Sequence, residues 1–416
     1  MNTNKKTPKL RFKGFTDDWE QRKLDDIAKI KTGGGTPKTA NPEYWSGNIP
    51  WIQSSDLVEG DIVHVNINKF INNNALKNSA AKLISRDSIA LVTRVGVGKV
   101  AVINQDFTTS QDFLSLSDFD GSDIKFLAYQ LYRLMQENAK VLQGTSIKGI
   151  TKTELIEQSI SIPSSGQEQN LISAVLSKID SIITLHQRKL EKLKLNKSAL
   201  LQKLFPQKGC TIPDVRFKGF TDAWEQRKLN DFGIATGGTS IESEFVDGGT
   251  YKVINIGSYS EESVYNDQGL RVNKTDKTKS RILNKYDLTM ILNDKTASGN
   301  IIGRVLLIDQ DNTYVYNQRT ERIEVDTKDF LPMFLYHMLN APEQRKYIVK
   351  ASQGNTQIYV NWSTISNIDY MIPQLLLEQE KIANLFSLIN KDITLHQRKL
   401  DCLISIKKGL LQQLFV

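Results

Sequence analysis

Apolar residues recur at alternating spacings of four and three in two long segments of the chain, one after Gln167 and one in residues 378–416. This is the period of a coiled coil, sustained over more than four heptads in each segment. Each seam spans 33 residues, which corresponds to a helix about 50 Å long. The predicted seam positions are Ile172, Leu176, Ile179, Ile183, His186, Leu190, Leu193, Lys197, Leu200 and Leu204, then Ile382, Phe386, Ile389, Ile393, His396, Leu400, Leu403, Lys407, Leu410 and Leu414.

A lone helix with such an apolar stripe would expose it to water, so we expect the two helices to pack on each other. The polar residues His186 and Lys197 interrupt the first seam, and His396 and Lys407 interrupt the second at equivalent places. Two interpretations stay open for them. They fix the register of the pair at a cost in stability, or their long side chains reach out to water at the edge of the seam.

Other apolar residues of these segments lie off the seam and predict a further contact surface. They are Val175, Leu185, Leu201, Leu385, Leu395 and Leu411. A helical pair with a spare apolar face is suited to docking another protein.

The chain also contains an internal repeat. RFKGFTDDWEQRKL, residues 11–24, recurs as RFKGFTDAWEQRKL in residues 216–229, and ITLHQRKL occurs at residues 183–190 and 393–400. Such a repeat reports the architecture more strongly than any local motif. We therefore predict a globular block over residues 1–166, a helix over 167–208, a second block over 209–377 and a second helix over 378–416.

Between these anchors, alternating apolar residues in GKVAVINQDF (98–107) and GRVLLIDQDN (303–312) predict equivalent strands in the two blocks. The loops between the shared strands differ in length and sequence. Two copies of one recognition module with different ligands would show this pattern, as would drift in unconstrained loops. The fold class expected is α+β, with mixed helices and strands in each block.

Connectivity suggests how the helices run. Each helix ends close to where the next block begins, so an antiparallel pair would place the blocks at opposite ends, related by an approximate twofold axis. Such a chain would meet a DNA duplex as a dimer meets a pseudo-palindromic site.

Composition excludes several classes of protein. Two cysteines and four histidines cannot supply a disulfide framework or a structural zinc site. No stretch of about 18 uncharged apolar residues is present, so we expect a cytoplasmic protein. The net charge of +8 divides into +3 for residues 1–166, +5 for 167–210, −2 for 211–377 and +2 for 378–416. The blocks are nearly neutral, so charge alone is weak support for a nucleic-acid partner.

The chain contains short matches to catalytic motifs, but each is either incomplete or followed by the wrong type of secondary structure. Gly96, Gly98 and Ala101 fit a G-x-G-x-x-A pattern, but the following VINQDF reads as strand and loop rather than helix. NPEY, residues 41–44, departs from the N-P-P-Y motif of amino-methyltransferases at Glu43. No constellation of serine, histidine and carboxylate is recognisable, so the chain is interpreted as a binding protein without metal or catalytic residues.

The loops contain the polar side chains that read base edges in a DNA groove and contact phosphates, although ordinary solvated loops have the same composition. Examples are KTGGGTPKT, WIQSSD and LVTRVGVGK in the first block and TGGTS, LNDKTASGN and YNQRTER in the second.

Together, the double RFKGFTDxWEQRKL opening, GGTP with YWSGNIPWI, the QGTS and QGNT segments and the two ITLHQRKL helices resemble the specificity subunit of type I restriction-modification systems. The resemblance covers essentially the whole chain. It implies two target recognition domains that each read half of a bipartite, asymmetric double-stranded DNA site, separated by an antiparallel coiled coil that sets the spacer.

The resemblance also implies partners. Two modification subunits would bind S-adenosylmethionine and methylate adenine N6, and restriction subunits would add ATP- and magnesium-dependent translocation and cleavage. No cofactor is expected in this chain. The alternatives are a self-contained DNA methyltransferase, or a coiled-coil scaffold without DNA function.

The candidate DNA contacts are polar loop residues of both blocks. The second block lacks the proline found at Pro37 and the stretch from Trp45 to Trp51, so transfer of the pattern is less direct there. The candidates are Thr36, Lys38, Gln53, Ser54, Arg94, Lys99, Gln111, Thr145 and Lys148 in the first block, and Thr239, Ser240, Asn255, Asn293, Lys295, Arg304, Gln318, Arg319, Asn355 and Gln357 in the second.

Overall fold

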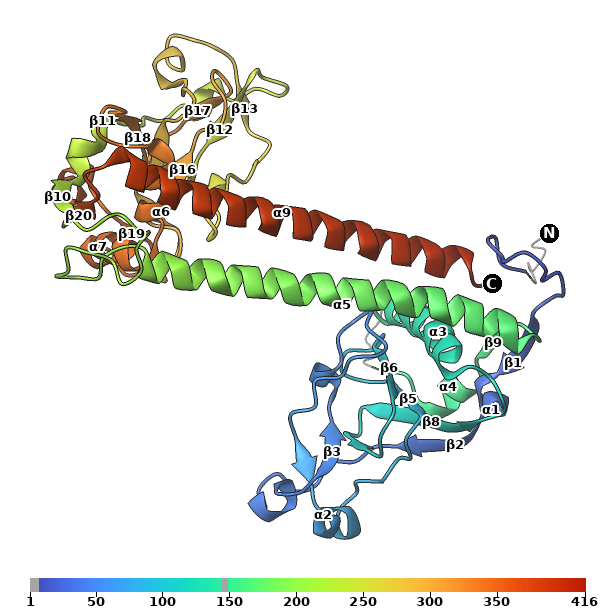
Figure 1. The fold of residues 1–416 in the computed structure, drawn as a ribbon. Helices are drawn as coiled ribbons and strands as arrows, with labels where there is room; N and C mark the ends of the chain where they lie inside the picture. Colours follow the sequence, from blue (N-terminus) through green and yellow to red (C-terminus); the bar gives the residue numbers. More distant parts are fainter. Residues whose placement is uncertain (1–6, 144–148) are drawn as a thin grey trace. The chain divides into compact units, whose positions relative to one another are not determined.

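The computed structural model describes residues 7–143 and 149–416, which form two compact units (Figure 1). Unit 1 comprises the chain up to Arg188 together with residues 397–416, and unit 2 comprises residues 189–396. Each unit thus contains one globular block and a portion of both long helices. The domain boundaries predicted from the sequence stay a prediction, because the compact units divide the helices along their length.

Unit 1 is built on an antiparallel four-stranded sheet of order β2-β8-β5-β6. A three-stranded sheet of order β4-β3-β7 and the pair β1-β9 complete it. The strands are β1 (Glu20–Lys23), β2 (Ala28–Gly33), β3 (Ile49–Ile52), β4 (Phe70–Ile71), β5 (Ser88–Val92), β6 (Val100–Ile103), β7 (Thr108–Thr109), β8 (Phe113–Phe119) and β9 (Ser159–Ile162). The short helices are α1 (Leu24–Ile27), α2 (Asn73–Asn78) and α4 (Lys152–Ile156), and the longer one is α3 (Ile124–Gln143).

Unit 2 repeats this topology. Its four-stranded sheet has the order β11-β18-β14-β16, its three-stranded sheet the order β13-β12-β17, and β10 pairs with β20. The strands are β10 (Glu225–Lys228), β11 (Gly233–Gly237), β12 (Tyr251–Ile254), β13 (Arg271–Val272), β14 (Leu288–Ile291), β16 (Val305–Leu307), β17 (Tyr314–Tyr316), β18 (Thr320–Val325) and β20 (Asp369–Ile372), with an additional pair β15 (Asn293–Asp294) and β19 (Ile358–Tyr359). The helices are α6 (Pro332–Leu339), α7 (Pro342–Ala351) and α8 (Trp362–Ile365). The α+β prediction is confirmed, as are the strands expected in residues 98–107 and 303–312.

The repeated opening motif is explained by packing. Trp19 contacts the rings of Phe126 on α3 and Phe415 near the C-terminus, with centroids 5.7 and 6.2 Å away. In unit 2, Trp224 contacts Phe334 and Phe205 in the same way, at 6.1 and 6.5 Å. Buried aromatic pairs at these separations stabilise a core beyond their buried area. The motif therefore fastens each block to the helices.

The two long helices are α5 (Gly166–Lys203) and α9 (Leu376–Gln413), as the apolar period predicts. In unit 1, Ile172 and Leu176 of α5 share a core with Leu411 and Leu414 of α9, and Asp180 lies beside Lys407. Residue numbers rise along one helix as they fall along the other, so the helices pack antiparallel. All twenty predicted seam positions are buried or half-buried.

One interruption of the seam is a buried ion pair in unit 1. The Lys407 ammonium group pairs with Asp180, donates to the carbonyl of Gly60 and lies 5.4 Å from the ring centre of Tyr129. The Tyr129 hydroxyl donates to Asp180 at 2.6 Å. Burial raises the pKa of Asp180, although Lys407 and Tyr129 oppose this. Lys407 therefore has defined partners, which favours the register interpretation over a side chain that reaches out to water.

The counterpart in unit 2 is different. Lys197 is half-buried, and burial lowers its pKa. Burial, and to a lesser extent the charge of Lys197, lowers the pKa of His337 to about 3. The residue equivalent to Asp180 in the repeat is Asn390, so the carboxylate that pairs with Lys407 has no counterpart there, and the charge of Glu262 only partly offsets the effect of burial on Lys197. The two lysines of the repeat thus occupy unlike environments.

Candidate nucleic-acid interface

In unit 1, the ends of several strands meet at one edge of the four-stranded sheet. β2 ends at Gly33, opposite Leu114 of β8, and β5 ends at Val92, opposite Phe113. The loops that follow β2 and β5 therefore lie beside the loop that precedes β8. The end of β3 joins them, because the backbone N–H of Ser110 donates to the carbonyl of Ile52 at 2.9 Å. We call this edge the loop edge of unit 1.

Nearly all recognition residues predicted in the first block belong to these loops. Thr36 and Lys38 follow β2, Gln53 and Ser54 follow β3, Arg94 and Lys99 connect β5 with β6, and Gln111 precedes β8. Thr145 and Lys148 lie outside the described residues. Antiparallel pairing of β2, β5 and β8 and parallel pairing of β3 with β7 thus bring together residues from four separate loops.

Several of these side chains bind one another. Thr36 donates its hydroxyl to the side-chain oxygen of Gln111 at 2.5 Å, and the Lys99 ammonium donates to the carbonyl of Ser54 at 2.9 Å. The Gln53 side-chain oxygen accepts from Lys69 at 3.2 Å. These bonds hold the loops together, and Lys99 in particular acts as an internal brace.

A cleft of about 680 Å³ opens at this loop edge. Arg94, Gln111 and Lys152 contribute polar groups to its lining, and Phe113 and Leu114 contribute apolar surface. Arg94 is exposed and has no side-chain hydrogen bond or ion pair to another residue that the structure describes. An exposed guanidinium beside an amide is suited to base edges or phosphate.

Unit 2 has the same arrangement. β11 ends at Gly237 opposite Glu321 of β18, β14 ends at Ile291 opposite Thr320, and Asn317 donates its backbone N–H to the carbonyl of Ile254 at the end of β12. We call this the loop edge of unit 2. The predicted residues are distributed as follows: Thr239 and Ser240 follow β11, Asn255 follows β12, Asn293, Lys295 and Arg304 lie between β14 and β16, Gln318 and Arg319 lie between β17 and β18, and Asn355 and Gln357 precede β19.

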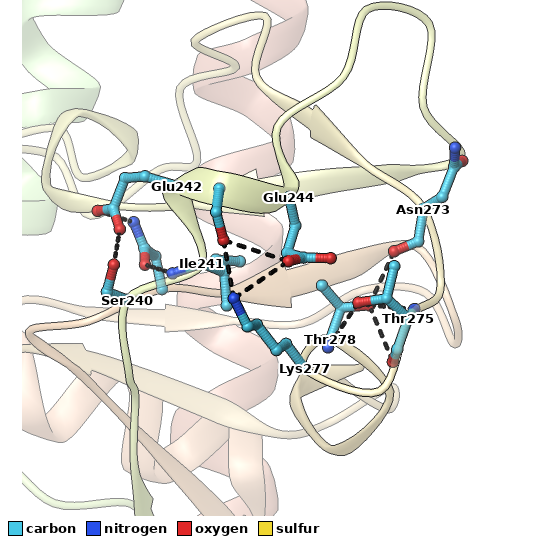
Figure 2. Close-up of polar contacts among 10 residues, drawn as sticks. Ser240, Ile241, Glu242, Glu244, Asn273, Thr275, Lys277 and Thr278 are labelled. Carbon is cyan, nitrogen blue, oxygen red and sulfur yellow. Dashed lines mark hydrogen bonds and ion pairs between the residues drawn. The ribbon is translucent and has the colours of Figure 1, made fainter.

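Asn317 and Glu242 hold the loop after β11 in place, and Figure 2 shows Glu242 beside Ser240. The Asn317 side chain accepts from the backbone of Ile241 at 3.1 Å and donates to Glu242 at 2.9 Å. Ser240 and Gln318 also donate to Glu242, and the hydrogen bonds from Ser240 and Asn317 lower the pKa of this carboxyl group. Glu242 therefore stays ionised and fixes two predicted recognition residues.

A second network supports the same region. Figure 2 shows Lys277 pointing toward Glu244, and their charged atoms lie 3.4 Å apart. The Thr278 hydroxyl accepts from the backbone of Thr275 and donates to the carbonyl of Asn273, both at 2.7 Å. These contacts order the segment between β13 and β14 and join it to the loop after β11 through Lys277 and Glu244.

The glycines of the two TGG segments are required by close packing. A Cβ on Gly34 would lie 1.9 Å from the carbonyl oxygen of Ser110, and one on Gly238 would lie 2.0 Å from that of Asn317. Any side chain would push the loop away from its neighbour. The same contact in both units shows that the glycines shape the loop edge.

The remaining predicted residues divide into two groups. Arg304 donates to Asn300 and Ser263 at 3.0 and 3.3 Å, and burial lowers its pKa, so it braces its loop as Lys99 does. Asn255 accepts from the backbone N–H of Gly257. By contrast, Lys38, Lys295 and Arg319 are exposed, and their side chains form no hydrogen bond or ion pair within the described part of the chain. The DNA role of all these residues stays a prediction.

Sequence reasoning missed Lys152, Asn317, Arg281 and Glu321, which also lie at the loop edges. Asn317 immediately precedes the predicted Gln318, so the YNQRTER segment already pointed to it. Glu321 stands at an inward position of a strand, which was the available signal. Within the described residues, no group of three or more His, Cys, Asp and Glu is placed to hold a metal ion. Gly96 and Gly98 lead into strand β6, not into a helix.

The described helices also include none that is long and apolar enough to cross a bilayer.

Comparison with known proteins gives a consistent result. The family described as "Type I restriction modification DNA specificity domain" matches residues 16–195 and 221–403. The MjaIX specificity subunit of a type I restriction enzyme from Methanocaldococcus jannaschii is 31% identical over 226 residues, which are 51% of this chain and 51% of that protein. This chain therefore aligns with about half the length of that relative. The MjaVIII specificity subunit of the same organism is 24% identical over 410 residues, 96% of this chain and 92% of that protein.

Solved structures agree at the level of the fold. The S subunit of a type I restriction-modification system from M. genitalium superposes with a TM-score of 0.63 at 17% identity, over 99% of both chains. A chain from a structure described as showing complex assembly and conformational transition of the type I R-M system superposes with a TM-score of 0.53 at 13% identity, over 95% of this chain and 97% of that chain.

Proposed function

The chain belongs to the family of type I restriction-modification DNA specificity domains, and from this premise we propose that it is the sequence-reading subunit of such a complex. Each unit reads one half of a split DNA site through its loop edge. The observation that carries this proposal is the duplicated loop edge, where the same strand ends gather polar and cationic loops in both units.

The chemistry of the loop edges supports base reading. Arginine, asparagine and glutamine can each form paired hydrogen bonds with base edges in the major groove. Arg94 with Gln111 in unit 1, and Gln318 with Arg319 in unit 2, supply these side chains next to each other in space or in sequence. Lys38 and Lys295 are exposed cations that would contact phosphates.

Differences between the loops support different targets. The loop between β5 and β6 spans residues 93–99, whereas the segment between β14 and β16 spans residues 292–304 and adds a short strand. Loops on a shared scaffold are where specificity changes without disturbing the fold. The two units therefore read unlike half-sites, which makes the full site asymmetric.

Catalysis belongs to partner subunits in this proposal. Modification subunits would bring S-adenosylmethionine and methylate adenine N6, and restriction subunits would bring ATP and magnesium, with the assembled complex acting on DNA in the cytoplasm. The long helices offer docking surface: Leu185 and Leu395 occupy equivalent repeat positions and are 64% and 48% exposed. Exposed leucines repeated at equivalent positions suit two copies of one partner.

The test is a selection experiment with the assembled complex of this chain and its modification subunits. A library of duplexes with randomised sequence is methylated, and the methylated molecules are sequenced. The proposal predicts two short specific sequences separated by an unread spacer. Methylation without sequence preference, or binding of S-adenosylmethionine by the isolated chain, would contradict it.

A further inference from the structure

Arg281, at the end of the short 3-10 helix before β14, braces the loop that follows β11. One terminal nitrogen donates to the carbonyl of Gly237 and, at 3.1 Å, to the hydroxyl of Tyr316, and the other donates to the Thr239 hydroxyl at 3.2 Å. The guanidinium carbon lies 5.2 Å from the centre of the Tyr316 ring. Arg281 therefore fixes the orientation of Thr239, which is a predicted DNA contact.

Glu321 lies against the same loop from the neighbouring strand. It is in register with Gly237, and a Cβ on Gly237 would lie 3.2 Å from its carboxylate oxygen. Glu321 is 6% exposed and forms no hydrogen bond or ion pair with a residue that the structure describes. A buried carboxylate without a hydrogen-bonding partner is unfavourable, and an apolar residue would avoid this cost.

Unit 1 lacks the carboxylate and the tyrosine at the matching positions, although Lys82 stands where Arg281 stands in unit 2. Leu114 pairs with Gly33 where Glu321 pairs with Gly237, and Thr109 pairs with Ile52 where Tyr316 pairs with Ile254. The carboxylate beneath the loop is thus a property of the loop edge of unit 2 and has no counterpart at that of unit 1.

We propose that Arg281 and Glu321 are positioning residues that determine the base preference of unit 2. This inference rests on the proposed function. Arg281 holds residues 237–239 in their reading position, and the charge of Glu321 attracts the Arg281 guanidinium toward the sheet. Loss of either group releases Thr239 and its neighbours from the geometry in which they meet the bases.

The position of Glu321 beneath this loop also makes the base preference of unit 2 depend on pH. Burial raises the pKa of Glu321 to about 7, against the opposing effect of the Arg281 charge. On the adjacent strands Glu321 faces Gly237 of β11 and Met290 of β14, neither of which titrates. Both protonation states of Glu321 are therefore populated near neutral pH, and only the ionised state attracts Arg281. Leu114 gives unit 1 no equivalent group.

The experiment uses the full-length chain assembled with its modification subunits and the randomised duplex library, at pH 6 and pH 8. The variants are Glu321→Gln, Glu321→Leu and Arg281→Lys, with Lys328→Gln, an exposed cation after β18, as the matched control. Arg94→Ala identifies the half-site of unit 1, because its preference relaxes in that variant.

We expect discrimination among bases in the half-site of unit 2 to fall about tenfold in the three variants, as loss of one well-placed polar contact does. The half-site of unit 1 stays unchanged, and Lys328→Gln behaves as the wild type. In the wild type, discrimination in the half-site of unit 2 changes between pH 6 and pH 8, and Glu321→Gln abolishes that change.

Folded variants that melt at or above the wild-type temperature and keep full discrimination in both half-sites would overturn the inference. If the variants do not fold, the wild-type pH profile decides: a base preference of unit 2 that is identical at pH 6 and pH 8 overturns it. A wild-type complex that yields no split motif refutes the proposed function itself, so the two failures are distinguishable.

Discussion

Arg11 donates two hydrogen bonds to the carboxylate of Glu168, from Nε at 2.8 Å and from Nη2 at 2.9 Å. Arg216 and Glu378 repeat this relationship in unit 2, at 2.7 and 2.8 Å. Each glutamate lies in the first turn of a long helix, where negative charge is favourable. The invariant part of the repeated RFKGF motif is thus a clamp between the start of a block and the start of its helix.

Breaking this clamp should destabilise the unit that contains it. The Glu168 side chain is 1% exposed and that of Arg11 is 14% exposed, so Glu168→Gln leaves a largely buried guanidinium without its counter-charge. We expect a loss of about 3 kcal/mol in the free energy of unfolding of unit 1, measured by urea denaturation. The matched control is Lys23→Gln, because Lys23 and Glu157 form an ion pair with both side chains more than half exposed. An equal loss of unfolding free energy in both variants would show that the clamp stabilises unit 1 no more than an exposed ion pair does.

The two seam lysines should respond in opposite ways to the same substitution. Lys407→Met leaves Asp180 buried without its cation, which should cost about 3 to 5 kcal/mol. Lys197→Met removes a partly buried charge whose pKa burial lowers in spite of the charge of Glu262, and Asn390 stands where Asp180 pairs with Lys407. Stability should therefore be unchanged or increase. Thermal unfolding of the two variants under one set of conditions checks this. Equal destabilisation would contradict the asymmetry described for the two units.

Glu321 should make the stability of unit 2 fall as pH rises. Its pKa is about 7 in the folded chain and near 4.5 when unfolded. Between these values the folded state binds a proton that the unfolded state has released, so the free energy of unfolding decreases with pH across this window and stays low above it. Glu321→Gln should remove this dependence and stabilise unit 2 at pH 8 by on the order of 2 kcal/mol. Denaturation at pH 5 and pH 8 measures it, and parallel profiles for wild type and variant would refute the assignment.

The sequence predicts the repeat, the two helices and the class of fold because these depend on periodic patterns. The helical spacing of Ile172 and Leu176 can be read directly from the sequence, and so can the strand pattern of apolar residues in residues 100–103. The clamp between Arg11 and Glu168 is not, because it joins residues 157 positions apart. The sequence alone locates the repeated motif, but it does not reveal the contact between Arg11 and Glu168 by which the motif joins the block to its helix.

The candidate site could be predicted only as a set of loops. Thr36 and Gln111 meet because β2 pairs with β8, and strand order is not encoded in any local pattern. Asp180 was missed because it lies off the apolar seam, and its burial depends on Tyr129 and Lys407. Some predicted contacts, such as Lys99, bind a neighbouring loop of the same unit, which no count of polar residues could show.

Each unit is proposed to read one half of the DNA site at its own loop edge. The most direct measurement maps the methylated motif produced by the complex with Arg94→Ala and, separately, with Arg319→Ala. These exposed cations lie at the loop edges of units 1 and 2, respectively.

We expect each variant to relax the base preference of one half-site by about 1 to 3 kcal/mol, to leave the other half-site intact and to preserve the spacer. Relaxation of both half-sites by either variant, or a contiguous motif in the wild type, would contradict this proposal.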